Sequence, residues 1–393
     1  MTTAATIERP SDSVRLSQDD ASRRLVRRAD MVPERVAFID CKMPGSHLKE
    51  NYSLIGPGVT QSKEQKVSIP EPHGFSLGVA AMPAGITNNL HLHYTAEVFM
   101  IYEGRWVFRW GPDGKEGEIV GEAGDVVSVP TWIFRGFSNV GDGDGWIFTA
   151  LGHDETGGII WHPDIIRVAA EHGLYLTKDN MMVDTAAGAP KPADEDLMEV
   201  IDEASIRSLR SYSVEEMARD HVVKKADRQW SARGLLDSAL DGHGAQVAPV
   251  LGHGISQDRD QLPPVRNPHG MSIDWVRIPA GGQVGRHRLR EKQALIVFSG
   301  EVELTLNADD PVVVRVGAQD LFSFPEGSWR AIRAIGGTDA EFVLMTAGDH
   351  RKHIEWASDV ERAAARAGFA IDHDGYVAEL RLLPPSAGAA LAG

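Results

Sequence analysis

Short apolar runs separated by turn-forming residues make up most of the hydrophobic pattern of this chain. Four of these runs span residues 97–103, 105–110, 295–299 and 302–306. They are rich in β-branched and aromatic residues, a composition typical of β-strands, and they are separated by Gly, Asp and Asn. Many short strands with such turn signals predict a sandwich or a barrel.

The same pattern occurs twice along the chain, with an offset of about 195 residues. The matching segments are 74–85 with 270–281, 125–130 with 320–325, and 161–173 with 356–368. An arginine follows the second segment in both copies, as Arg135 and Arg330. The third segment predicts a short helix in each copy, because its closing glycine is a residue that commonly ends helices. We therefore expect two copies of one β-rich unit.

The chain between the two copies has a helical and linker-like pattern. Residues 195–202 and 213–220 predict helices, and the second of these opens with a Ser-x-x-Glu capping box. Residues 186–193, which contain Ala, Gly and Pro, indicate a linker. Residues 1–70 have few periodic features, and we interpret them as an arm that covers a barrel edge or a neighbouring subunit. The tail after Leu382 is expected to be loose.

Length and charge restrict the class of protein. A chain of 393 residues suits about two domains plus connections. The net charge of −16 and the pI near 5.4 oppose a sequence-independent grip on nucleic acid, which needs clustered Lys and Arg.

Cysteine usage and hydrophobicity bear on the location of the protein. Cys41 is the only cysteine, so an intramolecular disulfide and a cysteine-built zinc site are excluded. Residues 1–14 lack the apolar core of a signal peptide, and no run approaches the roughly 20 apolar residues of a membrane span. We expect a soluble cytoplasmic protein that binds neither nucleic acid nor membrane.

The strongest chemical signal is a cluster of two histidines and a glutamate. His91 and His93 are two residues apart, so on a strand their side chains leave the same face roughly 7 Å apart at the backbone. Glu97 can join them only if the chain folds back near residues 94–96. Two imidazoles and one carboxylate are the ligand set of an open divalent iron site, and manganese, nickel, copper or zinc could also bind. The alternative is that these histidines are ordinary strand residues, hydrogen-bonded and inert.

The spacing Gly-x5-His-x-His-x3-Glu-x6-Gly over residues 85–104 resembles the first sequence signature of the cupin family. Because the strand pattern occurs twice, the chain resembles a bicupin, and the resemblance covers roughly residues 74–155 and 268–350, about two-fifths of the chain. This resemblance implies a mainly β fold of two cupin barrels, also called double-stranded β-helices or jelly rolls, with connecting helices. The expected divisions are an N-terminal arm at 1–70, a first cupin domain at 71–155, a helical connector and linker at 156–265, a second cupin domain at 266–350, and a C-terminal helix and tail at 351–393.

The second cupin signature is incomplete in the first copy. Gly124, Pro130 and Asn139 match it. Trp132 stands where glycine is usual, and Arg135 stands where the family has its remaining histidine ligand. A guanidinium cannot ligate a metal, so the resemblance supplies three protein ligands at most from these two motifs.

Three interpretations of Arg135 stay open at this point. In the first, the three ligands hold the ion, and Arg135 turns aside to bind a carboxylate or phenolate of the substrate, a contact that guanidinium forms well. In the second, no metal binds, Arg135 pairs with Glu97, and the histidines act as acid and base. In the third, Arg135 serves packing alone, since Arg330 occupies the same place in the other copy.

The second copy lacks the ligand set. His287, Leu289 and Gln293 occupy the three ligand positions, which leaves one imidazole and no carboxylate. A divalent ion needs several deprotonated donors, so we expect the second barrel to be structural or ligand-binding. A cationic pocket for an anion would use Arg286, His287, Arg288 and Arg330. The alternative is that these are ordinary charges along an exposed strand.

Further side chains near these motifs could complete the site. A fourth ligand could come from His153 or His162, and the alternative for each is a surface or helix-start position. An aromatic wall for a planar substrate could come from barrel-lining residues, with plain core packing as the alternative. The aromatic candidates are Trp132, Phe134, Trp106, Phe108 and Trp110.

The leading hypothesis is an iron-dependent dioxygenase for an aromatic or enolisable anionic small molecule. Open positions on divalent iron suit the joint binding of an oxidisable substrate and dioxygen, and the bicupins that this chain resembles include gentisate-type and quercetinase-type dioxygenases. Glu97 and Arg135 would then serve catalysis, although ring-cleaving bicupins usually have three histidine ligands. The alternatives are a redox-neutral metal-dependent isomerase, hydrolase or lyase, and a non-enzymatic small-molecule-binding protein. The family and the long arm favour a homodimer or larger homo-oligomer.

Overall fold

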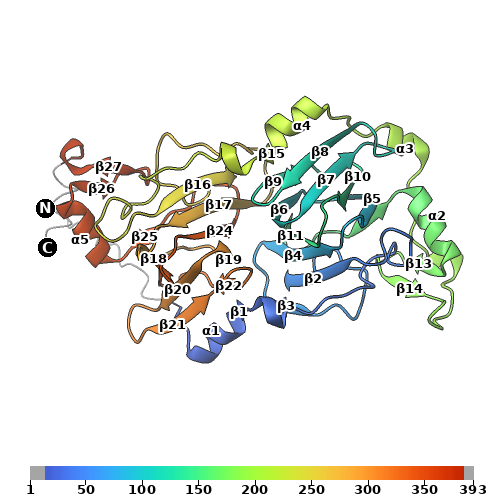
Figure 1. The fold of residues 1–393 in the computed structure, drawn as a ribbon, viewed down its shortest axis with the longest axis horizontal. Coiled ribbons are helices and arrows are strands. Elements are labelled where there is room, and N and C mark those ends of the chain that lie inside the picture. Colours follow the sequence, from blue (N-terminus) through green and yellow to red (C-terminus); the bar gives the residue numbers. More distant parts are fainter. Residues whose placement is uncertain (1–13, 385–393) are drawn as a thin grey trace, which may run out of the picture.

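The computed structural model describes residues 14–384 and contains two β-barrels that lie side by side (Figure 1). The first barrel is blue to green in Figure 1, and the second is yellow to orange. Two of the expectations above, for the N-terminus and for the loose tail, concern mainly residues 1–13 and 385–393, which lie outside the described part. The prediction of a mainly β fold with two cupin barrels is confirmed.

The first barrel consists of a seven-stranded sheet and a five-stranded sheet. The larger sheet has the order β15 (Val222–Val223), β9 (Val126–Val129), β6 (Glu97–Glu103), β11 (Gly145–Gly152), β4 (Phe75–Met82), β2 (Glu50–Ile55) and β3 (Val67–Ile69). The smaller has the order β12 (Ile159–Trp161), β5 (Thr87–His93), β10 (Arg135–Asn139), β7 (Arg105–Trp110) and β8 (Gly117–Glu122). Phe99 of the larger sheet packs on Phe108 and Phe137 of the smaller, with ring centroids 4.9 Å apart in both pairs, so the barrel core lies between the sheets.

The second barrel repeats this arrangement except for β3, which has no counterpart in its larger sheet. Its larger sheet has the order β1 (Leu25–Val26), β22 (Leu321–Phe324), β19 (Gln293–Ser299), β24 (Ala340–Ala347), β17 (Met271–Ile278) and β16 (Gln246–Leu251). Its smaller sheet has the order β21 (Val312–Val316), β20 (Glu301–Leu306), β23 (Arg330–Ile335), β18 (Gln283–Arg288) and β25 (Glu355–Trp356). The strands expected from the sequence at 97–103, 105–110, 295–299 and 302–306 all lie within these sheets.

A helix and a small hairpin follow each barrel. They are α2 (Pro163–Glu171) with β13 (Leu174–Leu176) and β14 (Met182–Asp184), and α5 (Ser358–Arg366) with β26 (Phe369–Ile371) and β27 (Val377–Glu379). Gly173 and Gly368 follow the two helices with φ of +74° and +89°, in the left-handed region that glycine tolerates. Both predicted helices are therefore confirmed.

The predicted helix over 195–202 is wrong. The structure has a short 3-10 turn, η2 (Asp194–Asp196), and then extended chain before α3 (Glu203–Arg207). Asp202 is the N-cap of α3, and its side chain accepts a hydrogen bond from Ser205 N. The acidic pattern there thus precedes a helix rather than forming one.

The repeat extends into the segments that precede each barrel. The element series α1 (Gln18–Arg24), β1 and η1 (Arg28–Asp30) occurs again as α4 (Val214–His221), β15 and η3 (Lys225–Asp227). In α4 the serine half of the predicted capping box is present, since the Ser213 side chain accepts a hydrogen bond from Glu216 N, whereas the Glu216 carboxylate pairs with Arg210. From here on, the first and second arms are residues 16–30 and 213–227, so the first arm is only a part of the N-terminal arm of 1–70 that the sequence led us to expect.

Each arm joins the opposite barrel. Strand β1 of the first arm pairs with β22 of the second barrel, whereas β15 of the second arm pairs with β9 of the first barrel. Figure 1 shows the same exchange, with the blue helix α1 beside the second barrel and α4 above the first. One core cluster also includes residues from the larger sheets of both barrels, among them Phe148 and Trp275. The two barrels are therefore packed into one body.

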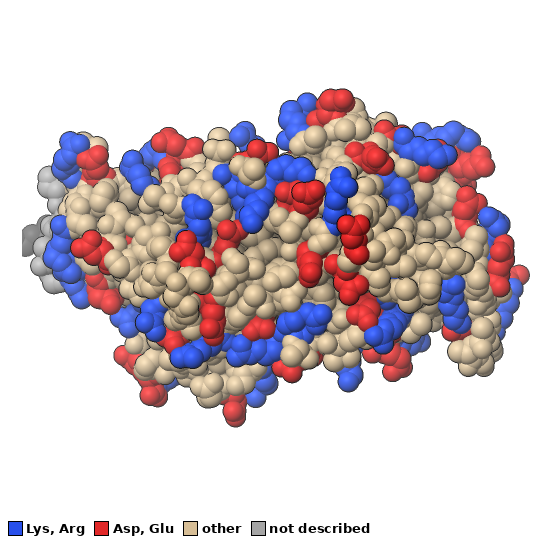
Figure 2. All heavy atoms as spheres, viewed as in Figure 1, with Lys and Arg blue, Asp and Glu red and all other residues tan. Residues whose placement is uncertain are grey.

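Two further observations bear on the class of protein. No helix within residues 14–384 has the length and the apolar character that a membrane span requires. Basic and acidic side chains are intermixed over the face shown in Figure 2, with neither sign gathered over one barrel.

Candidate metal centre

The turn between β5 and β6 brings the three predicted ligands together. His91 and His93 lie on β5, the chain reverses over 94–96 as predicted, and Glu97 is the first residue of β6. One donor atom from each side chain lies within 4.8 Å of the other two. All three side chains are buried, with at most 5% of any residue exposed. Within residues 14–384, this is the one cluster of three or more His, Cys, Asp or Glu side chains with metal-binding geometry.

Backbone carbonyls orient both imidazoles. His91 Nδ1 lies 2.6 Å from Asn89 O, and His93 Nδ1 lies 3.2 Å from Gly158 O. A carbonyl only accepts, so Nδ1 carries the proton in each ring and Nε2 keeps its lone pair. This arrangement, in which the second nitrogen donates to a carbonyl, is usual for histidines that ligate metals.

The ionisation states also suit a cation. Burial lowers the pKa of His91 well below its usual value, with further lowering by His93 and Arg135. Burial and Arg135 likewise lower the pKa of His93. Burial alone would raise the pKa of Glu97, but His93 and Arg135 outweigh it and lower that pKa to about 2. At neutral pH the cluster thus offers two neutral imidazoles and one carboxylate.

The donor set fits a divalent metal ion. Ligand bonds of about 2.0–2.2 Å place two donors on one ion at most roughly 4.4 Å apart, so the observed spread requires only a small adjustment. Three protein donors leave positions open for other ligands, as in catalytic sites. The structure therefore supports a divalent metal site at these residues.

Arg135 lies beside the carboxylate. Its Nε and Nη2 donate to Glu97 Oε2 at 3.2 and 3.1 Å, and its Nη1 donates to Ile133 O at 3.3 Å. The guanidinium is buried, with 1% of the residue exposed. This is the ion pair of the second interpretation, and it is compatible with a metal because both contacts are to one of the two carboxylate oxygens.

The second barrel has the same scaffold without the ligands. His287 Nδ1 contacts Gly285 O at 2.8 Å, as His91 Nδ1 contacts Asn89 O, and Arg330 Nη2 donates to Gln293 Oε1 at 3.0 Å. Leu289 is buried at the position of His93. The equivalent places thus hold one imidazole, one amide and no carboxylate.

Arg286 and Arg288, two of the residues considered for a cationic pocket in the second barrel, bind carboxylates of the protein itself. Arg288 makes two hydrogen bonds to Glu355, at 2.9 and 2.8 Å, and Arg286 lies 3.3 Å from Asp359. Both charges are paired at or near the surface, as the alternative interpretation expects.

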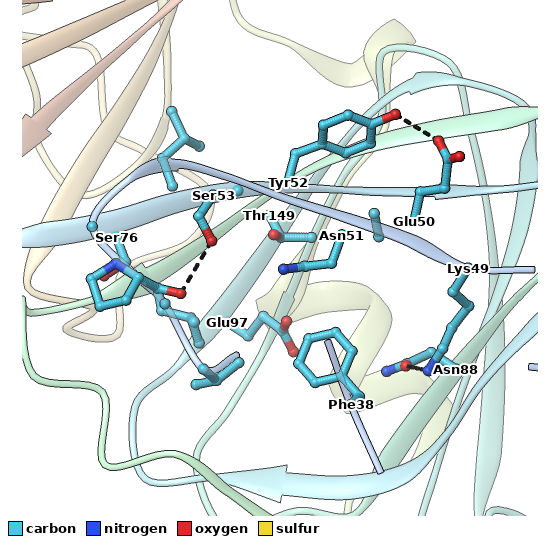
Figure 3. A pocket seen from close by; sticks show the side chains of 18 of the residues that line it. Phe38, Lys49, Glu50, Asn51, Tyr52, Ser53, Ser76, Asn88, Glu97 and Thr149 are labelled. Atoms are coloured by element: carbon cyan, nitrogen blue, oxygen red, sulfur yellow. Dashed lines mark hydrogen bonds between the residues drawn. The ribbon is translucent and has the colours of Figure 1, made fainter. Parts of the chain in front are cut away.

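A cavity adjoins the candidate metal centre inside the first barrel. Its volume is about 60 Å³, and Glu97 lies on its wall. Figure 3 shows the carboxylate of Glu97 facing the cavity, with Lys49 and Asn88 at one end and Ser76 at the other. Arg135 is not among the lining residues, so it contacts the carboxylate from the side that faces away from the cavity.

The sequence reasoning did not identify Lys49. This lysine lies just before β2, in a segment with no recognisable motif. The available signal was the repeat itself: β2 begins at Glu50 and the equivalent strand β16 begins at Gln246, so Lys49 corresponds to Ala245. A charged residue in one copy opposite alanine in the other marks a place where the two barrels differ in chemistry.

The remaining candidates lie outside the centre. His162 is the N-cap of α2, where its side chain accepts from Asp164 N, and His153 is not part of the donor cluster.

Trp132 is 45% exposed, and Phe134 packs in a separate small cluster. Trp106, Phe108 and Trp110 are buried in the core of the first barrel. Core packing is therefore the correct interpretation of these three aromatics.

Comparison with known proteins agrees with this architecture. The Cupin domain family matches residues 274–346, which form most of the second barrel. No curated protein matches the chain in sequence.

Solved structures with a similar fold include oxalate decarboxylases and a vicilin. A variant of Bacillus subtilis oxalate decarboxylase has a TM-score of 0.53 and 12% identity, covering 94% of this chain and 83% of that chain. Lactobacillus farciminis oxalate decarboxylase in complex with formate has a TM-score of 0.51 and 13% identity, covering 85% and 88%. Vicilin from Corylus avellana (hazelnut) has a TM-score of 0.51 and 10% identity, covering 88% and 93%. At such identities the similarity is one of fold.

Proposed function

We propose that this bicupin is a metal-dependent enzyme that holds a divalent ion at His91, His93 and Glu97 and acts on a small anionic molecule. The observation that supports this most directly is that the three donors converge in one barrel and that one of them, Glu97, also lines a cavity. The second barrel, with the same strands, has no such set. A purely structural role would not require this difference between two copies of one scaffold.

The cavity limits the size of the substrate. A water molecule needs roughly 10–15 Å³ of such space, so a cavity of about 60 Å³ holds roughly four to six non-hydrogen atoms. Benzene is known to occupy an engineered cavity of about 150 Å³. The cavity therefore favours a small carboxylate or enolisable anion, and an aromatic substrate would need the barrel to widen.

The residues of the centre would act as follows. His91 and His93 stay neutral and fixed by their carbonyl partners, so their Nε2 atoms are ready to bind without prior loss of a proton. Arg135 keeps Glu97 ionised and oriented. If the bound ion is iron, its open positions would allow an oxidisable substrate and dioxygen to bind together, which is dioxygenase-type chemistry.

A second candidate is redox-neutral cleavage or isomerisation at the same ligands. The small cavity favours it, because a two- or three-carbon acid fits without any widening. The fold similarity to oxalate decarboxylases agrees with this candidate, and one of those structures is described as having Mn(II) centres. Oxygen consumption separates the two candidates.

The test begins with metal content. Protein purified anaerobically without added metal should contain close to one divalent ion per chain by elemental analysis, and His93→Ala should contain much less. Oxygen uptake and carbon dioxide release are then followed with small carboxylates and with phenolic acids. Equal, background-level metal in both proteins would refute the proposal. Product formation without oxygen uptake would select the redox-neutral candidate.

A further inference from the structure

We propose that Lys49 and Asn88 form the recognition site for a carboxylate group of the substrate, within the cavity beside the metal centre. This inference rests on the proposed function and adds the substrate class to it. The ligand would be a small acid that bears a second oxygen group, such as a short dicarboxylate or 2-oxo acid.

Lys49 has an unused donor inside the protein. Its Nζ donates to Asp40 Oδ1 and to Asn88 Oδ1, both at 2.5 Å, and the side chain is only 7% exposed. An ammonium group has three N–H donors, so one remains for a ligand. Figure 3 shows the lysine reaching toward the cavity from the strand that leads into Tyr52, with its Nζ bonded to Asn88.

Asn88 connects the lysine to the metal centre. Its Nδ2 lies 3.4 Å from His91 Nδ1, but that nitrogen already donates to Asn89 O at 2.6 Å. The amide N–H groups of Asn88 therefore have no acceptor on this ring and are available to a ligand oxygen. A carboxylate held by Lys49 and Asn88 would lie next to a metal ligand.

The second barrel shows that the fold does not require these two polar residues. Asp40 accepts from Asn89 N, and Asp237 accepts from Gly285 N, so the two aspartates are equivalent. The alignment then places Val284 opposite Asn88 and Ala245 opposite Lys49. In the second barrel Asp237 is paired with His243 instead, at 2.7 Å. The aspartate thus has a basic partner in both barrels, and in the first barrel that partner is a lysine that lines the cavity.

The end of the cavity opposite Lys49 gives independent support for a bound ligand. Ser76 Oγ is buried and has no hydrogen-bond partner, although buried hydroxyls almost always have one. Its counterpart Ser272 donates to Thr346 O at 3.4 Å. Thr149 also faces the cavity, and its equivalent across the paired strands is Leu344. The cavity thus has the amino group of Lys49, paired with Asp40, at one end and the unpartnered hydroxyl of Ser76 at the other.

The side chains at one wall of the cavity also differ between the barrels. Register pairs Gly78 with Thr149 and Asp274 with Leu344, so Asp274 holds the place of Gly78. Gly78 and Thr149 line the cavity of the first barrel, whereas the buried Asp274 and Leu344 occupy the equivalent places in the second. This open wall with a hydroxyl group therefore belongs to the first barrel alone.

The test uses the residues of the second barrel as substitutions. Oxalate, malonate and pyruvate are titrated by calorimetry into full-length, metal-loaded protein, and metal content and thermal midpoint are recorded for each variant. At least one anion should bind the wild-type protein at a single site. Lys49→Ala should weaken that binding by about tenfold or more, because a hydrogen bond to a charged group is lost, with metal content unchanged. Asn88→Val should weaken it less.

Controls separate this inference from the proposed function. Lys42→Ala removes a lysine that pairs with Asp184 outside the cavity, and it should bind anion and metal as the wild type does. Lys49→Met, which keeps most of the stem, replaces Lys49→Ala if the alanine variant does not fold. Retained metal with no anion binding, or with equal binding in the lysine variants, overturns this inference alone. Loss of metal from the wild-type protein refutes the proposed function.

Discussion

At the scale of single residues, Arg135 and Arg330 perform the same contact on different partners. Each guanidinium donates to the side chain that opens a strand of the opposite, larger sheet, which is Glu97 of β6 in the first barrel and Gln293 of β19 in the second. Each also donates through Nη1 to a carbonyl two residues earlier. The arginine is therefore part of the scaffold. The two barrels differ instead in the candidate ligands, since Gln293 and Leu289 stand in the second barrel where the first has Glu97 and His93.

We expect Arg135→Gln to release metal at higher pH than the wild-type protein. Arg135 lowers the pKa values of Glu97, His91 and His93, so removing its charge raises all three. Protons then compete with the metal at higher pH. The measurement is metal retained after dialysis across a series from pH 4 to pH 7. An unchanged midpoint would show that the guanidinium does not control ionisation of the ligands.

A second prediction concerns Asp274 in the second barrel. Burial raises the pKa of this carboxyl to about 7, one oxygen accepts from Ile255 N at 3.0 Å, and the other has no partner. The unfolded chain loses this proton near pH 4, so the folded state binds the extra proton between about pH 4 and 7. The free energy of unfolding should therefore fall as pH rises through this window, by up to roughly 4 kcal/mol.

The substitution Asp274→Asn removes that titration while an amide oxygen keeps the hydrogen bond. The thermal midpoint of the variant minus that of the wild type should be larger at pH 8 than at pH 5. Asp142→Asn, at an exposed turn, serves as the control and should show no such difference. The same offset at both pH values for Asp274→Asn would contradict the assignment of a buried, protonated carboxyl.

Residue-level prediction from sequence succeeded where the spacing was local. His91 and His93 share a strand and Glu97 follows one turn later, so their convergence needed only strand geometry. Lys49 and Asn88 are 39 positions apart in the sequence. They come together because β2, which follows Lys49, is a strand of the first barrel. Side-chain direction over such a separation depends on tertiary packing, which no local pattern encodes.

At the scale of elements, the two arms exchange barrels through matching contacts. Asp125 of the first barrel accepts from Lys225 N and Lys224 Nζ of the second arm, both at 2.8 Å. Asp320 of the second barrel accepts from the equivalent residues of the first arm, Arg28 N and Arg27 Nη1, also at 2.8 Å. One carboxylate per barrel thus fixes the opposite arm.

Substitution of either aspartate should loosen the arm that it holds. Asp125 also accepts from Glu122 N at 3.0 Å, so Asp125→Ala leaves a backbone donor in the partly buried loop without its acceptor. We expect a loss of about 1–3 kcal/mol in the free energy of unfolding. Faster hydrogen exchange across 213–227 should accompany it, measured by mass spectrometry. Exchange that is faster elsewhere but unchanged over this arm would contradict the role assigned to the carboxylate.

The elements themselves were partly predictable. Strands and the two glycine-terminated helices carry strong periodic or capping signals, and they appear where expected. The helix expected at 195–202 failed because an acidic pattern fits both the interior of a helix and the chain before it. Leu197 pairs with Thr177 in an isolated bridge, a long-range contact that overrides this local preference.

At the scale of the whole molecule, the chain is built like a dimer within one polypeptide. The larger sheets of both barrels share a core cluster, and His73 and His269 reach across it to Ser323 and Ser128, at 2.7 and 2.5 Å. These two contacts are equivalent under the repeat. The sequence repeat predicted two similar barrels, but it gave no sign that they exchange arms, because the pattern of a short helix does not tell which barrel the helix packs against.

This exchange leads to a last prediction about the two halves of the chain. A cut within 186–193, a mostly exposed stretch between β14 and η2, separates the repeats without entering either barrel. Each half would then lack the arm that pairs with its own larger sheet, and it would expose the apolar face that the other barrel covers. Residues 1–189 and 190–393 expressed separately should therefore aggregate, whereas co-expression should give one complex with the metal content of the intact chain. The measurement is size-exclusion chromatography with elemental analysis of the peak. If 1–189 alone is monomeric and binds metal, the barrels are independent domains, and the arms are accessory rather than required.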